Sequence, residues 1–293
     1  MRAHLIDGTY ELFRHHFGTP AEARSAEGTT AATRGVLGSV LSLLGEGATH
    51  VGVATDHVVE SFRNDLWPGY KTSAGMPPEL LAQFPVVEDC LVAMGVVVWP
   101  MVAVEADDAL ASAAAGAAAD PAVDQVLIMT PDKDLAQCVV GERVVQVDRR
   151  QGTVSGAAGV VARFGVAPAS IPDYLALVGD SADGYPGLPG WGAKSAAAVL
   201  ARYLHIEDIP EQPGQWDVAV RGAPRLAASL AGQRDLAYLF RRLATLEIDR
   251  ALLGSVDDLR WTGPAPGFDD VARALGAPGL ADRAKALART RGC

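Results

Sequence analysis

The first half of the chain alternates short apolar segments, rich in β-branched residues, with longer stretches of helical periodicity. The predicted strands are residues 3–6, 51–55, 96–99, 125–129 and 144–147, and the predicted helices between them cover residues 30–44, 78–94 and 107–119. Strand–helix repetition at this spacing predicts an α/β fold with a mostly parallel sheet and helices on both faces.

The second half of the chain is helical. Strand signals stop after about residue 155, and the predicted helices are residues 158–164, 172–177, 193–203, 223–231 and 233–242. Residues 260–267 read as a loop before a terminal helical segment. We therefore expect three parts: an α/β core over residues 1–157, a helical region over residues 158–260 and a C-terminal helical tail over residues 261–293.

Acidic residues follow four consecutive predicted strands. They are Asp7, Asp56, Glu105, Asp107, Asp108, Asp132 and Asp134. The carboxyl ends of parallel strands lie at one edge of a sheet, where ligand sites form, so these side chains should converge. Oxygen-only ligands indicate Mg²⁺ or Mn²⁺ rather than zinc. Two such ions form the usual clamp for in-line attack on a phosphodiester.

Each of these acids also has a structural explanation when it is taken alone. An Asp at a strand end is often a helix N-cap. Asp107 and Asp108 open a predicted helix, where the macrodipole favours acids. The coincidence over four strand ends favours the metal site.

The sequence GDSADGYPGLPGWGAKSAAA, residues 179–198, places Asp180 and Asp183 before a glycine-rich turn that opens a predicted helix. Glycines expose backbone N–H groups, and these groups and a helix N-terminus can hold a phosphate. The candidate contacts are Gly187, Gly190, Gly192 and Lys194. The turn also fits a plain connection between helices. Because the turn follows the two acids, both features can serve one nucleic acid. Metal ions at the acids would cut one phosphate, and the turn would hold others a few nucleotides away.

Composition constrains the location and the partners of the protein. The net charge of −10 argues against a nucleic-acid binder. If nine carboxylates hold metal ions, however, the remainder is close to neutral. The three cysteines are an odd number without metal-ligand spacing, so they read as reduced thiols. The N-terminus has no signal-peptide layout and no apolar run is long enough for a membrane span, so we expect a cytoplasmic protein.

Several motifs occur together in the order and at the spacing of a known family. LIDG, TDHVVESFRNDLWPGYK, VEADD, TPDKDL and GDSADGYPGLPGWGAKSA resemble the 5′ nuclease domain of bacterial DNA polymerase I and the related flap endonucleases, over residues 3–200. The resemblance implies a PIN-like core and a helix–three-turn–helix region. It also implies a structure-specific 5′ nuclease in DNA replication and repair. Because no polymerase region follows, we expect a free-standing enzyme.

The resemblance implies roles for individual residues. One divalent ion would be held by Asp7, Asp56, Glu105 and Asp107, and a second would be held or supported by Asp108, Asp132, Asp134, Asp180 and Asp183. The catalytic side chains would be Lys71, in an arch over about residues 62–80, and Arg14. The DNA contacts would be Arg34, Arg63, Trp67, Tyr70 and the glycine turn with Lys194, where a potassium ion would also bind. Arg34 and Arg63 could equally be surface residues without a role in DNA binding.

The sequence departs from the family pattern at two positions. Ala74 stands where the family usually has an arginine, and Gly184 replaces the asparagine of GDxSDN. The expected substrate is DNA with a 5′ flap, or a nicked or gapped duplex. We expect the protein to be a monomer, with a separate DNA polymerase as a partner in trans.

Three other function classes fit parts of the sequence. A HAD-type phosphatase needs a nucleophilic Asp two residues before Asp7, where this chain has Leu5. A catalytically impaired DNA-structure-binding relative would be expected to have lost one or more acids. RNA-cleaving PIN domains are usually shorter and lack the glycine-turn region.

Overall fold

The computed structural model describes residues 1–24 and 29–292 and contains two compact units. The first unit comprises residues 1–59, 73–130 and 248–293, and the second comprises residues 60–72 and 131–247. Each unit is therefore built from segments that are distant in the sequence, whereas the predicted domains were consecutive. Cys293, one of the three predicted thiols, lies outside the described residues.

The first unit is organised around parallel strands. These are β1 (Arg2–Asp7), β2 (His50–Asp56), β3 (Val97–Met101) and β4 (Gln125–Met129), in the order β3-β2-β1-β4. Every residue of β2 is buried, as expected for a strand covered on both faces. The predicted parallel sheet is confirmed. Its register places the ends of β1 and β2 at one edge, because Asp7 pairs with Ala54.

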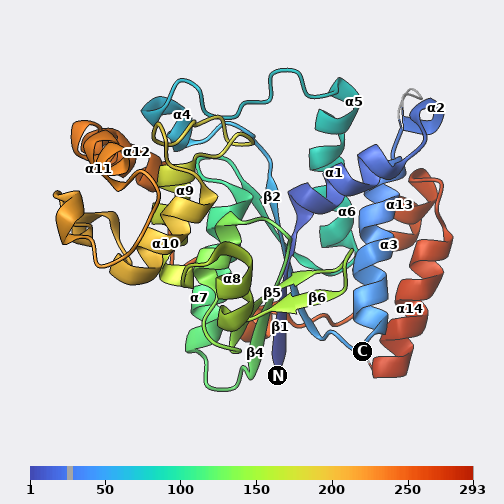
Figure 1. Cartoon of the computed structure of the whole chain (residues 1–293). Helices are drawn as coiled ribbons and strands as arrows, with labels where there is room; N and C mark the ends of the chain where they lie inside the picture. The colour runs from blue at the N-terminus through green and yellow to red at the C-terminus, as the bar shows by residue number, and fades with distance from the viewer. Residues whose placement is uncertain (25–28, 293) are drawn as a thin grey trace. The chain divides into compact units, whose positions relative to one another are not determined.

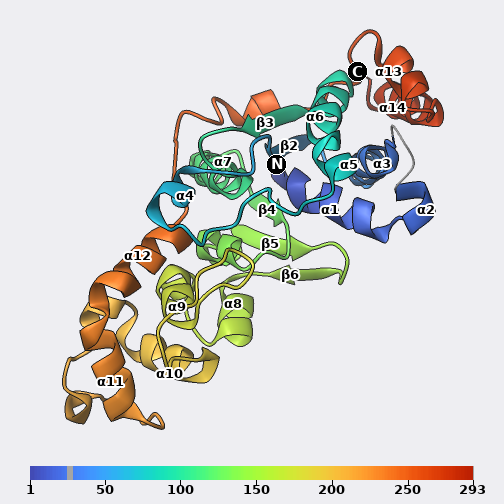
Figure 2. The same ribbon diagram turned by 90° about the horizontal axis from the view of Figure 1, so that it is seen from above.

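Helices cover both faces of these strands (Figure 2). On one face lies α7 (Ala106–Ala119), and on the other lie α1 (Gly8–Gly18), α3 (Ala31–Gly45) and α6 (Gln83–Ala93). The unit also contains α2 (Ala21–Arg24), α5 (Pro78–Leu81), α13 (Phe268–Ala274) and α14 (Gly279–Arg291). The helix predicted over residues 78–94 is divided into α5 and α6. Pro85 has no N–H to donate to the Leu81 carbonyl four residues earlier, so the helix is interrupted there.

The second unit is mainly helical (Figure 1). Its helices are α4 (Phe62–Leu66), α8 (Ala157–Phe164), α9 (Ile171–Val178), α10 (Ala193–Tyr203), α11 (Ala223–Gly232) and α12 (Arg234–Ala244). The predicted helical region is confirmed, and α9 packs against α10 and α12. The unit also holds an antiparallel pair, β5 (Val144–Asp148) and β6 (Thr153–Ser155), of which β6 was not predicted. No helix that the structure describes is long and apolar enough to cross a membrane.

Candidate functional site

Two predicted metal ligands lie at the ends of neighbouring strands in the first unit. The Asp7 carboxylate accepts hydrogen bonds from the Tyr10 backbone N–H, at 2.7 Å, and from the Thr130 hydroxyl, at 2.9 Å. Asp56 accepts one from the backbone N–H of Ala106, at 2.8 Å. Both side chains are buried. Asp7 is thus also the N-cap of α1, and the structural and metal-binding explanations apply to the same residue.

The remaining acids of the first unit surround the start of α7. Glu105 and Asp108 are buried, and the Glu105 backbone N–H donates to Asp108 Oδ2 at 2.8 Å. Asp107, in the first turn, is half-buried. Among the described residues of this unit, the five predicted acids do not bring three ligand atoms within 4.8 Å of one another. The structure gathers this set less closely than the second one.

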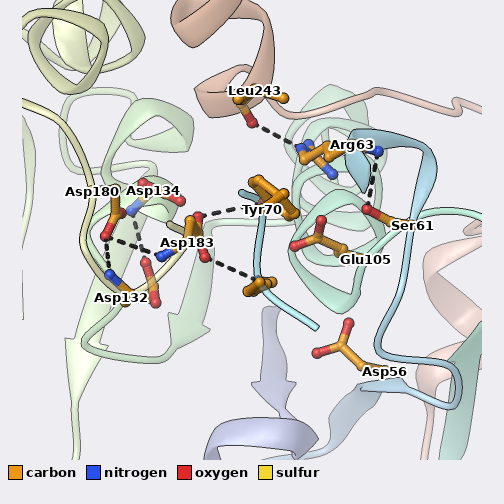
Figure 3. A network of polar contacts seen from close by, with 12 residues as sticks. Asp56, Ser61, Arg63, Tyr70, Glu105, Asp132, Asp134, Asp180, Asp183 and Leu243 are labelled. Atoms are coloured by element: carbon orange, nitrogen blue, oxygen red, sulfur yellow. Dashed lines mark hydrogen bonds and ion pairs between the residues drawn. The ribbon is translucent and has the colours of Figure 1, made fainter. Parts of the chain in front are cut away.

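The acids of the second unit form a compact cluster (Figure 3). Asp134, Asp180 and Asp183 are all buried and place carboxylate oxygens within 4.8 Å of one another. Asp134 begins a short 3₁₀ helix, and the other two lie in the loop after α9. Asp132 is exposed beside them, and its Oδ1 accepts a hydrogen bond from the Asp134 backbone N–H at 2.9 Å. The structure therefore brings these four predicted ligands together.

The electrostatics of this cluster fit a divalent cation. Burial raises the pKa of Asp134 well above its usual range, and the negative charges of Asp132, Asp183 and Asp180 raise it further. Its Oδ1 atom is buried and has no hydrogen-bond partner among the described residues. Leaving such an atom unsatisfied costs about 1–3 kcal/mol. A hard cation with oxygen ligands would satisfy Oδ1 and offset the repulsion.

Two lysines contribute positive charge to the same cluster. Lys133 Nζ lies 2.6 Å from Asp180 Oδ2, and Lys71 Nζ lies 3.3 Å from Asp183 Oδ1. Burial acts to lower the pKa of Lys133, but the Asp180 contact and the nearby acids hold that pKa above its ordinary value. We did not predict a role for Lys133. Its position between two acids in TPDKDL is the sequence signal that could have indicated one.

Tyr185 is a second residue that the sequence analysis missed. Its side chain is buried, its ring stacks on Phe240 at 5.4 Å, and its hydroxyl has no hydrogen-bond partner among the described residues. Burial raises the pKa of this phenol, and the charges of Asp134 and its neighbouring acids raise it further. The hydroxyl is therefore a neutral, buried donor near the carboxylates.

Tyr185→Phe is expected to stabilise the metal-free protein by about 1 kcal/mol, because it removes an unsatisfied hydroxyl and keeps the ring stacked on Phe240. The measurement is urea unfolding with EDTA and with saturating Mg²⁺. A smaller gain with Mg²⁺ would show that the hydroxyl finds a partner in the metal-loaded site. Clear destabilisation in EDTA would contradict the prediction.

Two of the predicted DNA contacts, Arg63 and Tyr70, are buried inside the second unit. Arg63 is 1% exposed and donates to the backbone carbonyls of Leu243 and Thr245, at 2.8 and 3.1 Å. Tyr70 is buried, with its hydroxyl 3.4 Å from an Asp183 carboxylate oxygen (Figure 3). These placements argue against direct DNA contact by either residue. The spacing of the motif could not indicate which way the side chains point.

Trp67 is half-buried rather than presented on an open surface. Its indole N–H donates to the Gly184 carbonyl at 3.0 Å, and its ring meets Phe240 edge-on at 5.1 Å. Trp67 thus makes its contacts within the protein in this structure, and its predicted contact with DNA stays a prediction.

The other predicted basic residues lie in the first unit. Arg14, on α1, pairs with the buried Glu11 at 2.5 Å. Burial would raise the pKa of Glu11, but contacts from His15 and Arg14 outweigh it and lower that pKa to about 2. Arg34 is exposed and donates to the Leu275 carbonyl at 3.2 Å.

The glycine turn leads directly into α10. Gly187 and Gly190 have positive φ, +70° and +87°, and a Cβ at Gly187 would lie 2.4 Å from the backbone nitrogen of Gly179. Gly192 is the N-cap of α10, and Lys194 is exposed in its first turn. The turn therefore presents a helix N-terminus and a cation next to each other, a combination that suits a phosphate.

The sequence matches two consecutive family models. Residues 2–165 match the 5′-3′ exonuclease N-terminal resolvase-like domain, and residues 166–266 match the 5′-3′ exonuclease C-terminal SAM fold. The chain belongs to the 5′-3′ exonuclease family. The acidic cluster uses residues from both matched regions, because Asp134 lies in the first and Asp180 and Asp183 lie in the second.

Individual members of the 5′-3′ exonuclease family are similar to most of this chain. DNA polymerase I of Pseudomonas aeruginosa is 34% identical over 265 residues, which are 87% of this chain but 28% of the polymerase. The chain thus spans little more than a quarter of that relative. The 5′-3′ exonuclease of Aquifex aeolicus is 32% identical over 263 residues, which are 89% of this chain and 87% of that protein.

A solved structure of the bacteriophage T5 flap endonuclease, in a pseudo-enzyme–product complex with DNA and metal ions, has the same fold. Its TM-score is 0.63 at 18% identity, and the match covers 98% of each chain. The α/β and helical architecture described above is thus that of a structurally characterised 5′ nuclease.

Proposed function

We propose that this protein is a structure-specific 5′ nuclease, a 5′-3′ exonuclease or 5′-flap endonuclease, that hydrolyses DNA phosphodiesters in replication and repair. The observation that carries the proposal is the buried Asp134–Asp180–Asp183 cluster with its unsatisfied Asp134 Oδ1. Closely spaced, buried carboxylates repel one another, and a bound divalent cation would offset that repulsion. Family membership identifies phosphodiester hydrolysis as the reaction that such a site serves.

Mg²⁺ or Mn²⁺ would be the cofactor, because every candidate ligand is a carboxylate. One ion would be held by Asp7, Asp56, Glu105 and Asp107, and the other would be held or supported by Asp108, Asp132, Asp134, Asp180 and Asp183. When bound, such ions lower the pKa of a water molecule and stabilise the charge on the leaving oxygen. A potassium ion at the glycine turn rests on the resemblance alone.

The protein's own side chains would orient the substrate. Lys71 would stabilise charge on the scissile phosphate, and Arg14 would be a further catalytic side chain. The turn through Gly187, Gly190 and Gly192 would hold a phosphate of the duplex away from the cut, through backbone N–H groups and Lys194.

Lys194→Ala is expected to raise KM for a flap duplex about tenfold with little change in kcat, because a contact remote from the cut contributes uniform binding. The salt dependence of DNA binding should fall by about one ion per complex. The measurements are steady-state kinetics and binding titrations at several salt concentrations. Lys285→Ala, which removes a lysine paired with Asp269 in the first unit, is the matched control. A collapsed kcat with unchanged KM would contradict the assignment.

The protein's partners and location follow from this activity. We propose that it acts as a cytoplasmic monomer on 5′-flap, nicked or gapped DNA, with a DNA polymerase supplied in trans. The deciding experiment is incubation of a 5′-flap duplex, labelled at either end, with Mg²⁺, Mn²⁺ or EDTA, followed by sizing of the products. Metal-dependent products support the nuclease. Binding of the flap without cleavage would instead favour the catalytically impaired, DNA-structure-binding relative.

A further inference from the structure

Residues 60–72, here called the clamp segment, belong to the second unit. One end is anchored by Arg63, whose buried guanidinium donates to the carbonyls of Leu243 and Thr245. Asn64 Nδ2 donates to the Lys71 carbonyl at 2.9 Å, which ties the two ends of the segment together. The clamp segment is therefore fixed at both ends to a folded body.

The second half of the clamp segment contacts the loop that carries Asp183. The Lys71 backbone N–H donates to the Asp183 carbonyl at 3.0 Å, and Lys71 Nζ lies 3.3 Å from Asp183 Oδ1. The Tyr70 hydroxyl lies 3.4 Å from Asp183 Oδ2. One residue later, the Gly184 carbonyl accepts the indole N–H of Trp67 at 3.0 Å. Both oxygens and the backbone of a candidate metal ligand are thus oriented by this segment.

The close approach depends on glycine at position 184. Gly184 has φ +82°, and a Cβ there would lie 1.9 Å from the Gly69 carbonyl oxygen. Any side chain would push the clamp segment away from the loop. The departure from GDxSDN is thereby explained: the glycine leaves room for residue 69, and the Trp67 hydrogen bond holds the loop at that point.

We propose that Trp67 is a positioning residue for the metal site. Its indole N–H fixes the Gly184 carbonyl, and so holds the Asp183 carboxylate where it can bind a divalent cation together with Asp134 and Asp180. The inference rests on the proposed function, since it assumes that this cluster binds metal. The competing explanation is that Trp67 only packs against Phe240, edge-on at 5.1 Å.

Trp67→Phe tests the two explanations, because phenylalanine keeps an aromatic ring for Phe240 and removes the indole N–H, together with the second ring of the indole. One neutral hydrogen bond corresponds to about a five- to tenfold change in an equilibrium constant. We therefore expect Mn²⁺ affinity at the cluster to fall by about that factor. Cleavage at low Mn²⁺ should fall in parallel and recover at high Mn²⁺.

Mn²⁺ binding to the full-length, DNA-free protein is measured by the EPR signal of the free ion. Asp134→Asn shows which bound ions belong to the cluster. The matched control is Trp216→Phe, which removes an indole N–H that donates to the Pro210 carbonyl at 2.7 Å in the same unit. Trp216→Phe should leave Mn²⁺ affinity unchanged.

The outcomes distinguish this inference from the proposed function. Unchanged Mn²⁺ affinity in Trp67→Phe, with Mn²⁺ bound normally by the parent, overturns the positioning role and leaves the nuclease intact. A parent protein that binds no Mn²⁺ overturns both. If Trp67→Phe does not fold, Tyr70→Phe is the variant to test in its place. Tyr70→Phe removes only the hydroxyl beside Asp183. Weakened Mn²⁺ binding in that variant supports the role of the clamp segment, and unchanged binding overturns it.

Discussion

Asp134→Asn is expected to reduce metal-dependent cleavage of a flap duplex by about 10³-fold or more, because a lost metal ligand costs several kcal/mol of transition-state stabilisation. Asp134 is buried, and its Oδ1 has no hydrogen-bond partner among the described residues. Single-turnover cleavage over a range of Mg²⁺ concentrations gives the measurement.

The same substitution is expected to raise the melting temperature of the protein in EDTA. A neutral amide at position 134 removes the repulsion between this residue and Asp132, Asp180 and Asp183, which costs free energy while no cation is bound. In excess Mg²⁺ the order should reverse, since binding stabilises the parent more. The control is Asp217→Asn, an exposed acid paired with Arg202 at 2.6 Å in the same unit. Undiminished cleavage by Asp134→Asn, or cleavage by the parent in excess EDTA, would overturn the metal assignment.

Lys71→Ala is expected to lower kcat by about 10²-fold, which is the effect of removing one preorganised charge from a developing negative charge. The ammonium group lies 3.3 Å from Asp183 Oδ1 and is 29% exposed, so it stands at the cluster and remains accessible. Ala74 supplies no second cation where the family usually has an arginine. We therefore expect Lys71 to be the main basic side chain at the scissile phosphate.

Ala74→Arg provides the complementary variant. If a second cation is missing from this protein, Ala74→Arg should raise kcat or partly restore the Lys71→Ala variant. Lys194→Ala is the control for general loss of positive charge, because it should change KM rather than kcat. Cleavage by Lys71→Ala at the parental rate under single-turnover conditions would remove Lys71 from the proposed catalytic residues.

The backbone architecture could largely be predicted from sequence because its signals are local. The strand predicted over residues 125–129 and the helix predicted over residues 193–203 have the bounds observed in the structure. The failures also have local causes. The sequence analysis did not identify α1, which begins at Gly8 directly after the Asp7 cap, and it missed the break before Pro85. Short β6 has exposed residues and little apolar pattern to detect.

The candidate site was predictable to a smaller extent, because side-chain direction depends on tertiary contacts. The family resemblance grouped Asp134 with Asp180 and Asp183, and the structure brings them together. Spacing could not show that Arg63 turns toward the Leu243 carbonyl rather than toward solvent. The sequence around Arg63 is the same whether the side chain is buried or faces solvent, so it could not predict the direction.

The assignment of residues 60–72 to the second unit limits how this protein can be dissected or recombined. A fragment that ends near residue 165, where the first family model ends, would keep Arg63. It would lose the Leu243 and Thr245 carbonyl groups that accept hydrogen bonds from the buried guanidinium. A chimaera that exchanges only residues 166–266 between relatives would combine a clamp segment from one ancestor with a Gly184 loop from another. We therefore expect Gly69 and residue 184 to be inherited as a pair, although the chain separates them by more than a hundred positions.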